Sequence, residues 1–188
     1  MGDDSVSLLH HILILAAAIV AVFCQAAMPG LFHWFGAQVS LLPALMVYAG
    51  LQSGVVTLTL AAWLGGLCFD SLSANPLGIS FLPLFLVGFA IDSRRELILR
   101  DQVFAQVVLG LLASAIVPTL TVLMLLSTGK SPLLGWGSLW QLSVMTIAGG
   151  IATPLLFAMF NWLNRALGYQ PVSESSFRPD REIRRGRH

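Results

Sequence analysis

Asp70 is the one charged residue between Asp4 and Asp92, in a stretch dominated by Leu, Ala, Val, Ile, Phe and Gly. An acid in such a stretch could carry a proton, contact a substrate or bind a partner. Alternatively, it ends an apolar helix and accepts hydrogen bonds from the following turn and from the start of the next helix. We favour this structural role, because Asp70 precedes a polar turn and does not stand in the middle of an apolar run.

Other chemistry-bearing residues are few. The chain has no HExxH, no GxSxG and no glycine-rich phosphate loop, and its apolar blocks hold no paired acids at helical spacing. His10, His11 and His33 are interpreted as residues at a membrane interface and not as ligands. Cys24 and Cys68 are interpreted as small buried residues, and a pairing between them stays open. The sequence therefore predicts no catalytic residue, no metal site and no cofactor, and we expect a protein that is not an enzyme.

The composition places these residues in a membrane. The 188-residue chain is 56% hydrophobic and 10% charged, with a mean hydropathy of +0.82, whereas globular domains are about 25% charged. A soluble domain cannot be built from so few charges. The pattern predicts an all-α membrane protein with a bundle of about six transmembrane helices.

The expected helices follow from apolar blocks separated by breakers. The block at 37–69 is broken near 50–54 into two short helices, and whether that hairpin fully spans stays open. The expected division is a segment 1–7, a six-helix domain 8–163 and an arginine-rich tail 164–188 that is expected to be disordered. The apolar blocks are 8–27, 37–69, 79–91, 103–126 and 138–163.

The basic residues set the expected orientation. Of the ten Lys and Arg residues, Lys130 alone lies outside the segment 92–102 and the segment that follows Trp162. An even number of spans puts both segments and both termini on one side, and the positive-inside rule makes that side the cytoplasm. This basic footprint is typical of a membrane face and not of a nucleic-acid surface.

Helix packing leaves two questions open. Prolines inside the blocks indicate kinked helices (Pro43, Pro83, Pro118 and Pro154). They reflect either the ordinary tolerance of membrane helices for proline or a cavity built between bent helices, and we favour the first because we expect no polar groups to converge beside them. Small residues recur at four-residue spacing and predict close helix contacts, either within the chain or with a partner (Ala61 and Gly65; Gly110, Ser114 and Pro118; Gly149 and Thr153).

A family resemblance appears where these features combine. Gly65-Gly66-Leu67-Cys68-Phe69-Asp70, the following Pro76-Leu77-Gly78, an arginine-bearing connector and the upstream Leu42-Pro43-Ala44 resemble the MreD family of rod shape-determining proteins. The resemblance covers roughly residues 10–165. The candidate structural or interaction residues are Asp70, Asn75, Pro76, Gly78, Gly65, Gly66, Pro43, Arg94 and Arg95.

The resemblance implies a non-catalytic subunit of the bacterial inner membrane. Such proteins work with the bitopic protein MreC in the elongation machinery that inserts peptidoglycan along the side wall. The implied partners include MreB filaments, a RodA-type glycosyltransferase, its transpeptidase and membrane lipids. The implied fold is similar to the substrate-binding subunits of energy-coupling-factor transporters, so a vitamin-binding transporter subunit is the alternative function. The polar residues expected in the outer loops are few for a solute site (Asp70, Ser71, Ser73, Asn75 and Lys130).

Overall fold

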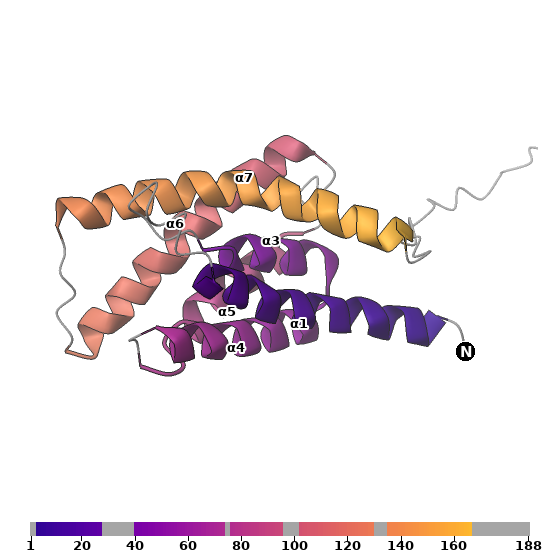
Figure 1. Cartoon of the computed structure of the whole chain (residues 1–188), viewed down its shortest axis with the longest axis horizontal. Coiled ribbons are helices and arrows are strands. Elements are labelled where there is room, and N and C mark those ends of the chain that lie inside the picture. Colours follow the sequence, from indigo (N-terminus) through magenta and orange to yellow (C-terminus); the bar gives the residue numbers. More distant parts are fainter. Residues whose placement is uncertain (1–2, 28–39, 74–75, 96–101, 130–134, 167–188) are drawn as a thin grey trace, which may run out of the picture.

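The structure, a computed structural model, describes residues 3–27, 40–73, 76–95, 102–129 and 135–166 (Figure 1). Within these residues the chain is all helical, which confirms the predicted all-α class. The helices are α1 (Asp3–Ala27), α3 (Leu42–Gln52), α4 (Val55–Leu72), α5 (Phe81–Asp92), α6 (Val103–Ser127) and α7 (Trp136–Ala166). The expected tail falls almost wholly on 167–188, which lies outside the described residues.

The helix ends lie close to the predicted breakers. The break expected near 50–54 is the two-residue connection Ser53-Gly54 between α3 and α4. At the end of α6, Gly129 has a φ of +77° and its N–H donates to the Leu126 carbonyl over 3.1 Å. Glycine adopts this left-handed conformation without a Cβ penalty, which is why helices so commonly end this way.

Among the described residues, three helices are long and apolar enough to cross a membrane, namely α4, α6 and α7. The chain is therefore compatible with a membrane protein. α3 and α5 are shorter, with 11 and 12 residues, or about 17 and 18 Å of helix against a hydrocarbon core of about 30 Å.

α3 lies at the centre of the bundle and contacts each of the other described helices (Figure 1). Every residue from Leu42 to Leu51 is buried. Its largest side chain, Tyr48, stacks on Phe160 of α7 with ring centroids 4.2 Å apart and meets the edge of Phe157 at 4.9 Å. The core is thus built around a helix with no exposed face.

α6 and α7 pack so closely that their backbones nearly touch. A Cβ at Gly110 of α6 would lie 2.7 Å from the Gly149 carbonyl oxygen of α7, and a Cβ at Gly149 would collide with Ser114. The Thr153 hydroxyl, which faces Gly110, donates to the Gly149 carbonyl over 2.8 Å. The two small-residue faces therefore pack against each other, which answers the question left open by the sequence in favour of internal packing.

The helices run in two opposite directions. His11 of α1 contacts Thr57 near the start of α4, and Gly65 further along α4 lies beside Ala18, so α1 and α4 are parallel. One cavity is lined by residues from the starts of α3, α5 and α7 and from the ends of α4 and α6. α1, α4 and α6 therefore run one way and α3, α5 and α7 the other, and the start of α1 and the end of α7 lie at the same end of the molecule (Figure 1).

Candidate functional site

The candidate site is the junction between α4 and α5, where Asp70 is 1% exposed. Its Oδ2 accepts hydrogen bonds from the N–H groups of Gly78 and Ser80, at 2.8 and 3.1 Å. Its Oδ1 accepts one from the Ser80 hydroxyl at 2.5 Å. Both carboxylate oxygens are therefore engaged by the turn and by the start of the next helix, the contacts that the structural role of Asp70 requires.

The turn depends on glycine at position 78. The Ile79 N–H donates to the Pro76 carbonyl over 3.3 Å, which closes a four-residue turn with Gly78 in its third position. Gly78 has a φ of +89°, the value that a type II turn requires at that position and that glycine adopts most readily. In this conformation the Gly78 N–H reaches the Asp70 carboxylate.

Asp70 also supplies the acidic group that the N-terminus of α5 lacks. α5 has no acidic residue in its first turn, and Ser80, which precedes its first residue, forms no side-chain cap. Instead the Ser80 hydroxyl donates to Asp70. The free N–H groups and the dipole at a helix N-terminus favour a negative charge nearby. A carboxylate from α4 therefore holds the first turn of α5.

Gly65 and Gly66 allow α4 to approach three neighbours at once. A Cβ at Gly66 would lie 3.0 Å from the backbone of Phe81, the first residue of α5. A Cβ at Gly65 would lie 2.7 Å from Leu42 Cδ2 on α3 and 3.7 Å from Ala18 on α1. The glycine pair and Asp70 thus act on the same unit: the glycines bring α5 against α4, and the carboxylate fixes the connection.

A cavity of about 250 Å³ lies beside this unit and overturns one expectation. Pro43 and Pro118 both line it, together with Ser80. For Pro43 and Pro118, the prediction that nothing polar converges beside the prolines is therefore wrong, because α3, α5 and α6 are distant in sequence but meet at this end of the bundle. The polar residues that line the cavity are Ser40, Ser73, Ser80, Thr121 and Gln141. Of these, Ser80 carries a usable sequence signal, a serine at a helix start.

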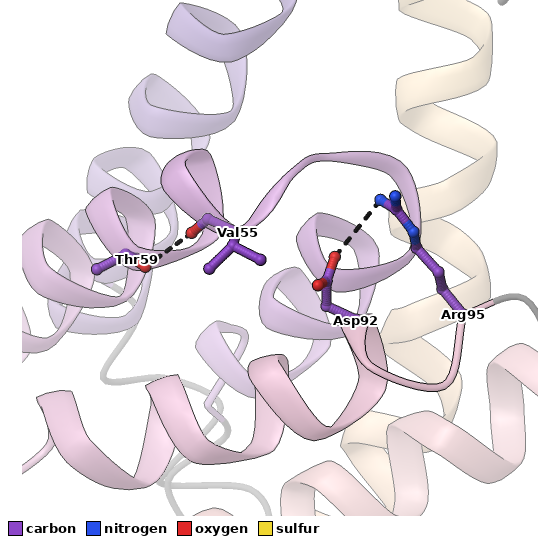
Figure 2. A network of polar contacts seen from close by, with 4 residues as sticks. All are labelled: Val55, Thr59, Asp92 and Arg95. Carbon is purple, nitrogen blue, oxygen red and sulfur yellow. Dashed lines mark hydrogen bonds and ion pairs between the residues drawn. The ribbon is translucent and has the colours of Figure 1, made fainter.

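Arg94 and Arg95 lie at the opposite end of α5, away from Asp70. Arg95 forms an ion pair with Asp92, with Nη1 and Oδ1 3.5 Å apart (Figure 2). An exposed pair of this kind contributes about 0–1 kcal/mol. Close by in the same view, the Thr59 hydroxyl donates to the Val55 carbonyl in the first turn of α4. The structure thus divides the candidate residues between the two ends of the bundle.

The remaining chemistry-bearing side chains are dispersed. His11 Nδ1 lies 2.9 Å from the Thr57 hydroxyl. Cys24 and Cys68 are both free thiols, one exposed and the other half-buried. Within the described part of the chain, no three His, Cys, Asp or Glu side chains gather where a metal could bind. His33 and Asn75 lie outside the described residues.

No family model, no curated protein and no solved structure matches this chain. The chemistry of the site is structural: a carboxylate with both oxygens occupied, a turn that needs glycine and two glycines that allow backbone contact.

Proposed function

We propose that this protein is a non-catalytic membrane subunit of the cell-wall elongation machinery, with a role like that of the MreD family. In this role it binds an MreC-like bitopic membrane protein and helps to organise lateral peptidoglycan synthesis together with MreB filaments, a RodA-type glycosyltransferase and its transpeptidase. The outcome is maintenance of rod shape.

One observation carries the proposal: three of the residues behind the family resemblance, Gly66, Asp70 and Gly78, form one tightly constrained unit. Gly66 admits the α5 backbone, Asp70 fixes the connection, and Gly78 forms the turn. Residues used in this way fix the shape of a surface and are not free to react. That use suits a protein that acts by presenting a rigid scaffold to partners.

The helix directions support six spans with both termini in the cytoplasm. Arg94 and Arg95 follow α5, and Arg165 lies in the last turn of α7. These helices end on the side where α1 begins, so the basic residues gather at one end of the bundle (Figure 1). The positive-inside rule assigns that end to the cytoplasm of a bacterial inner membrane. Asp70, the turn and the cavity then lie on the outer side.

The cavity beside Pro43 supports a second candidate, a substrate-binding subunit of an energy-coupling-factor-type vitamin transporter. Ser, Thr and Gln residues from several helices line it, as a solute site requires. The hydroxyls of Ser73, Ser80 and Thr121 already donate to acceptors within the chain. Its volume of about 250 Å³ is below the roughly 300–1,000 Å³ typical of pockets for drug-sized ligands. For this reason we place the scaffold first.

Purification of the tagged full chain from native membranes separates the two candidates. Recovery of an MreC-like bitopic protein, and rounding of rod-shaped cells on depletion, are expected for the scaffold. Recovery of a pair of ATPases with a bound small molecule would favour the transporter. Turnover of a lipid-linked substrate by the purified chain alone would reject the non-catalytic assignment.

A further inference from the structure

A second cavity, of about 360 Å³, lies between α5 and α6 and extends from Arg94, at the end of the bundle opposite Asp70, to Leu120 of α6. Of the described residues that line it, nine are Leu, Val, Ala or Ile, and the tenth is Arg94, in the turn that follows α5. From Arg94 to Leu86 the groove follows α5 for about 12 Å, at 1.5 Å per residue.

The groove is open to the surroundings of the bundle. Leu86, Leu112 and Ile116 line it and are 44%, 52% and 43% exposed. Ala90, which is also exposed, offers a short side chain on the α5 wall. The long helix α6 forms the other wall and is one of the three that can cross a membrane. An apolar groove on such a helix faces hydrocarbon when the helix is in a bilayer.

Arg94 differs from its neighbour Arg95. Arg95 is paired with Asp92 (Figure 2) and does not line the groove. Arg94 is exposed, and its guanidinium forms no hydrogen bond or ion pair with another residue in the part of the chain that the structure describes. A guanidinium offers planar paired donors that match the oxygens of a phosphate group. The groove therefore combines an apolar channel with a positive charge at one end that no described acid neutralises.

We propose that this groove binds one acyl chain of an anionic phospholipid, whose phosphate group pairs with Arg94. The charge complementarity decides the occupant: an apolar segment alone would leave Arg94 without a partner, and a soluble phosphate alone would leave the groove unfilled. Basic pockets between membrane helices bind anionic lipid headgroups for the same reason. The site is independent of the function proposed above.

The test uses native mass spectrometry of the purified full chain, titrated with phosphatidylglycerol or with phosphatidylcholine carrying the same acyl chains. One molecule of phosphatidylglycerol is expected to bind per protein chain, with an affinity well above that of phosphatidylcholine. Arg94→Gln should weaken that binding about fivefold, the factor that corresponds to about 1 kcal/mol for one basic residue near a lipid surface. The matched control Arg95→Gln should change it less than twofold.

A second pair of variants tests the acyl chain. Ala90→Trp fills the groove and should abolish the high-affinity site, whereas Ala16→Trp, at an exposed alanine of α1, should leave it intact. Glycerol phosphate at millimolar concentration should not compete. Equal binding of the two lipids by the unaltered protein would overturn the proposal without any variant. Equal losses in the two arginine variants, equal losses in the two tryptophan variants, or competition by glycerol phosphate would overturn it as well.

Discussion

Ser80 and Asp70 lie ten residues apart in the chain, yet the Ser80 hydroxyl oxygen lies 2.5 Å from Asp70 Oδ1. The N–H of the same serine donates to the other carboxylate oxygen. Because Asp70 belongs to α4 and Ser80 immediately precedes α5, this pair joins two helices directly. The α4–α5 connection therefore depends on an acceptor with two oxygens at position 70.

Replacing Asp70 with Leu should destabilise the fold by at least ~2 kcal/mol, because a buried donor without a partner costs about 1–3 kcal/mol and three donors lose theirs. Asp70→Asn should cost about 1 kcal/mol, since its amide oxygen can accept the two N–H bonds while its amide nitrogen donates to the Ser80 hydroxyl. Thermal unfolding in detergent and abundance in membranes measure both effects.

The Asn variant also tests whether the charge itself is used. If Asp70 acts through structure, the Asn variant should restore rod shape in a depleted strain about as well as the natural sequence does. A variant that is normally abundant in the membrane but inactive would instead assign the carboxylate to a partner or substrate contact.

Gly78→Ala should lower stability by more than ~1 kcal/mol, because a φ of +89° is strained for any residue with a Cβ. Gly54→Ala is the matched control. Gly54 also lies at a helix junction, but its φ is −79° and nothing surrounds it within 4 Å. Unfolding temperatures of the two variants give the comparison, and equal effects would mean that the turn does not depend on the backbone conformation of Gly78.

Gly149→Ala should destabilise the α6–α7 contact by about 1–3 kcal/mol, the usual cost of overpacking, because the added Cβ would collide with Ser114. In the Gly149→Ala background, Ser114→Gly should restore part of the lost stability, since it removes the side chain with which the new Cβ collides. Gly137→Ala, also in α7 but in open space, should be neutral or slightly stabilising. A double-mutant cycle of unfolding free energies measures the coupling, and additive effects at 114 and 149 would contradict the contact.

Reporter fusions test the orientation. Fusions after Arg100 and after Arg181 should both report the cytoplasm, and fusions near Asn75 and Lys130 should report the outer side. The reason is the separation of Arg94, Arg95 and Arg165 from Asp70 across the bundle. An external signal after Arg100 would exclude the six-span arrangement.

The helix boundaries and the hydrogen bonds of Asp70 could be predicted, because they depend on residues that are neighbours in the sequence. α6 begins at Val103 as expected, since the charged connector ends there, and the α3–α4 break lies at Ser53-Gly54 within the expected 50–54. The hydrogen bonds of Asp70 followed from an acid placed before a turn with proline and glycine. In each case a breaker or a charge stands out against an apolar background.

The burial of individual helices could not be predicted in this way. Leu45 of α3 is 1% exposed and Leu123 of α6 is 55% exposed, although both stand in apolar runs. Lipid is as apolar as a protein core, so hydrophobicity does not tell one from the other. The cavity beside Pro43 was only the less favoured interpretation of the prolines for a related reason, because Ser40, Thr121 and Gln141 meet only through tertiary packing.

The burial of α3 has a consequence for the way this protein meets a bilayer. A helix of 11 residues exposed to lipid would force the membrane to thin around it, at a cost that grows with each ångström of mismatch. α3 has protein on every side from Leu42 to Leu51, so it imposes no such deformation. The thickness that a bilayer must match is set instead by the helices with exposed apolar faces, which include α6 and α7 at 25 and 31 residues and the 12-residue α5. The chain can therefore keep its shortest helix at the centre of the bundle without that helix thinning a membrane around it.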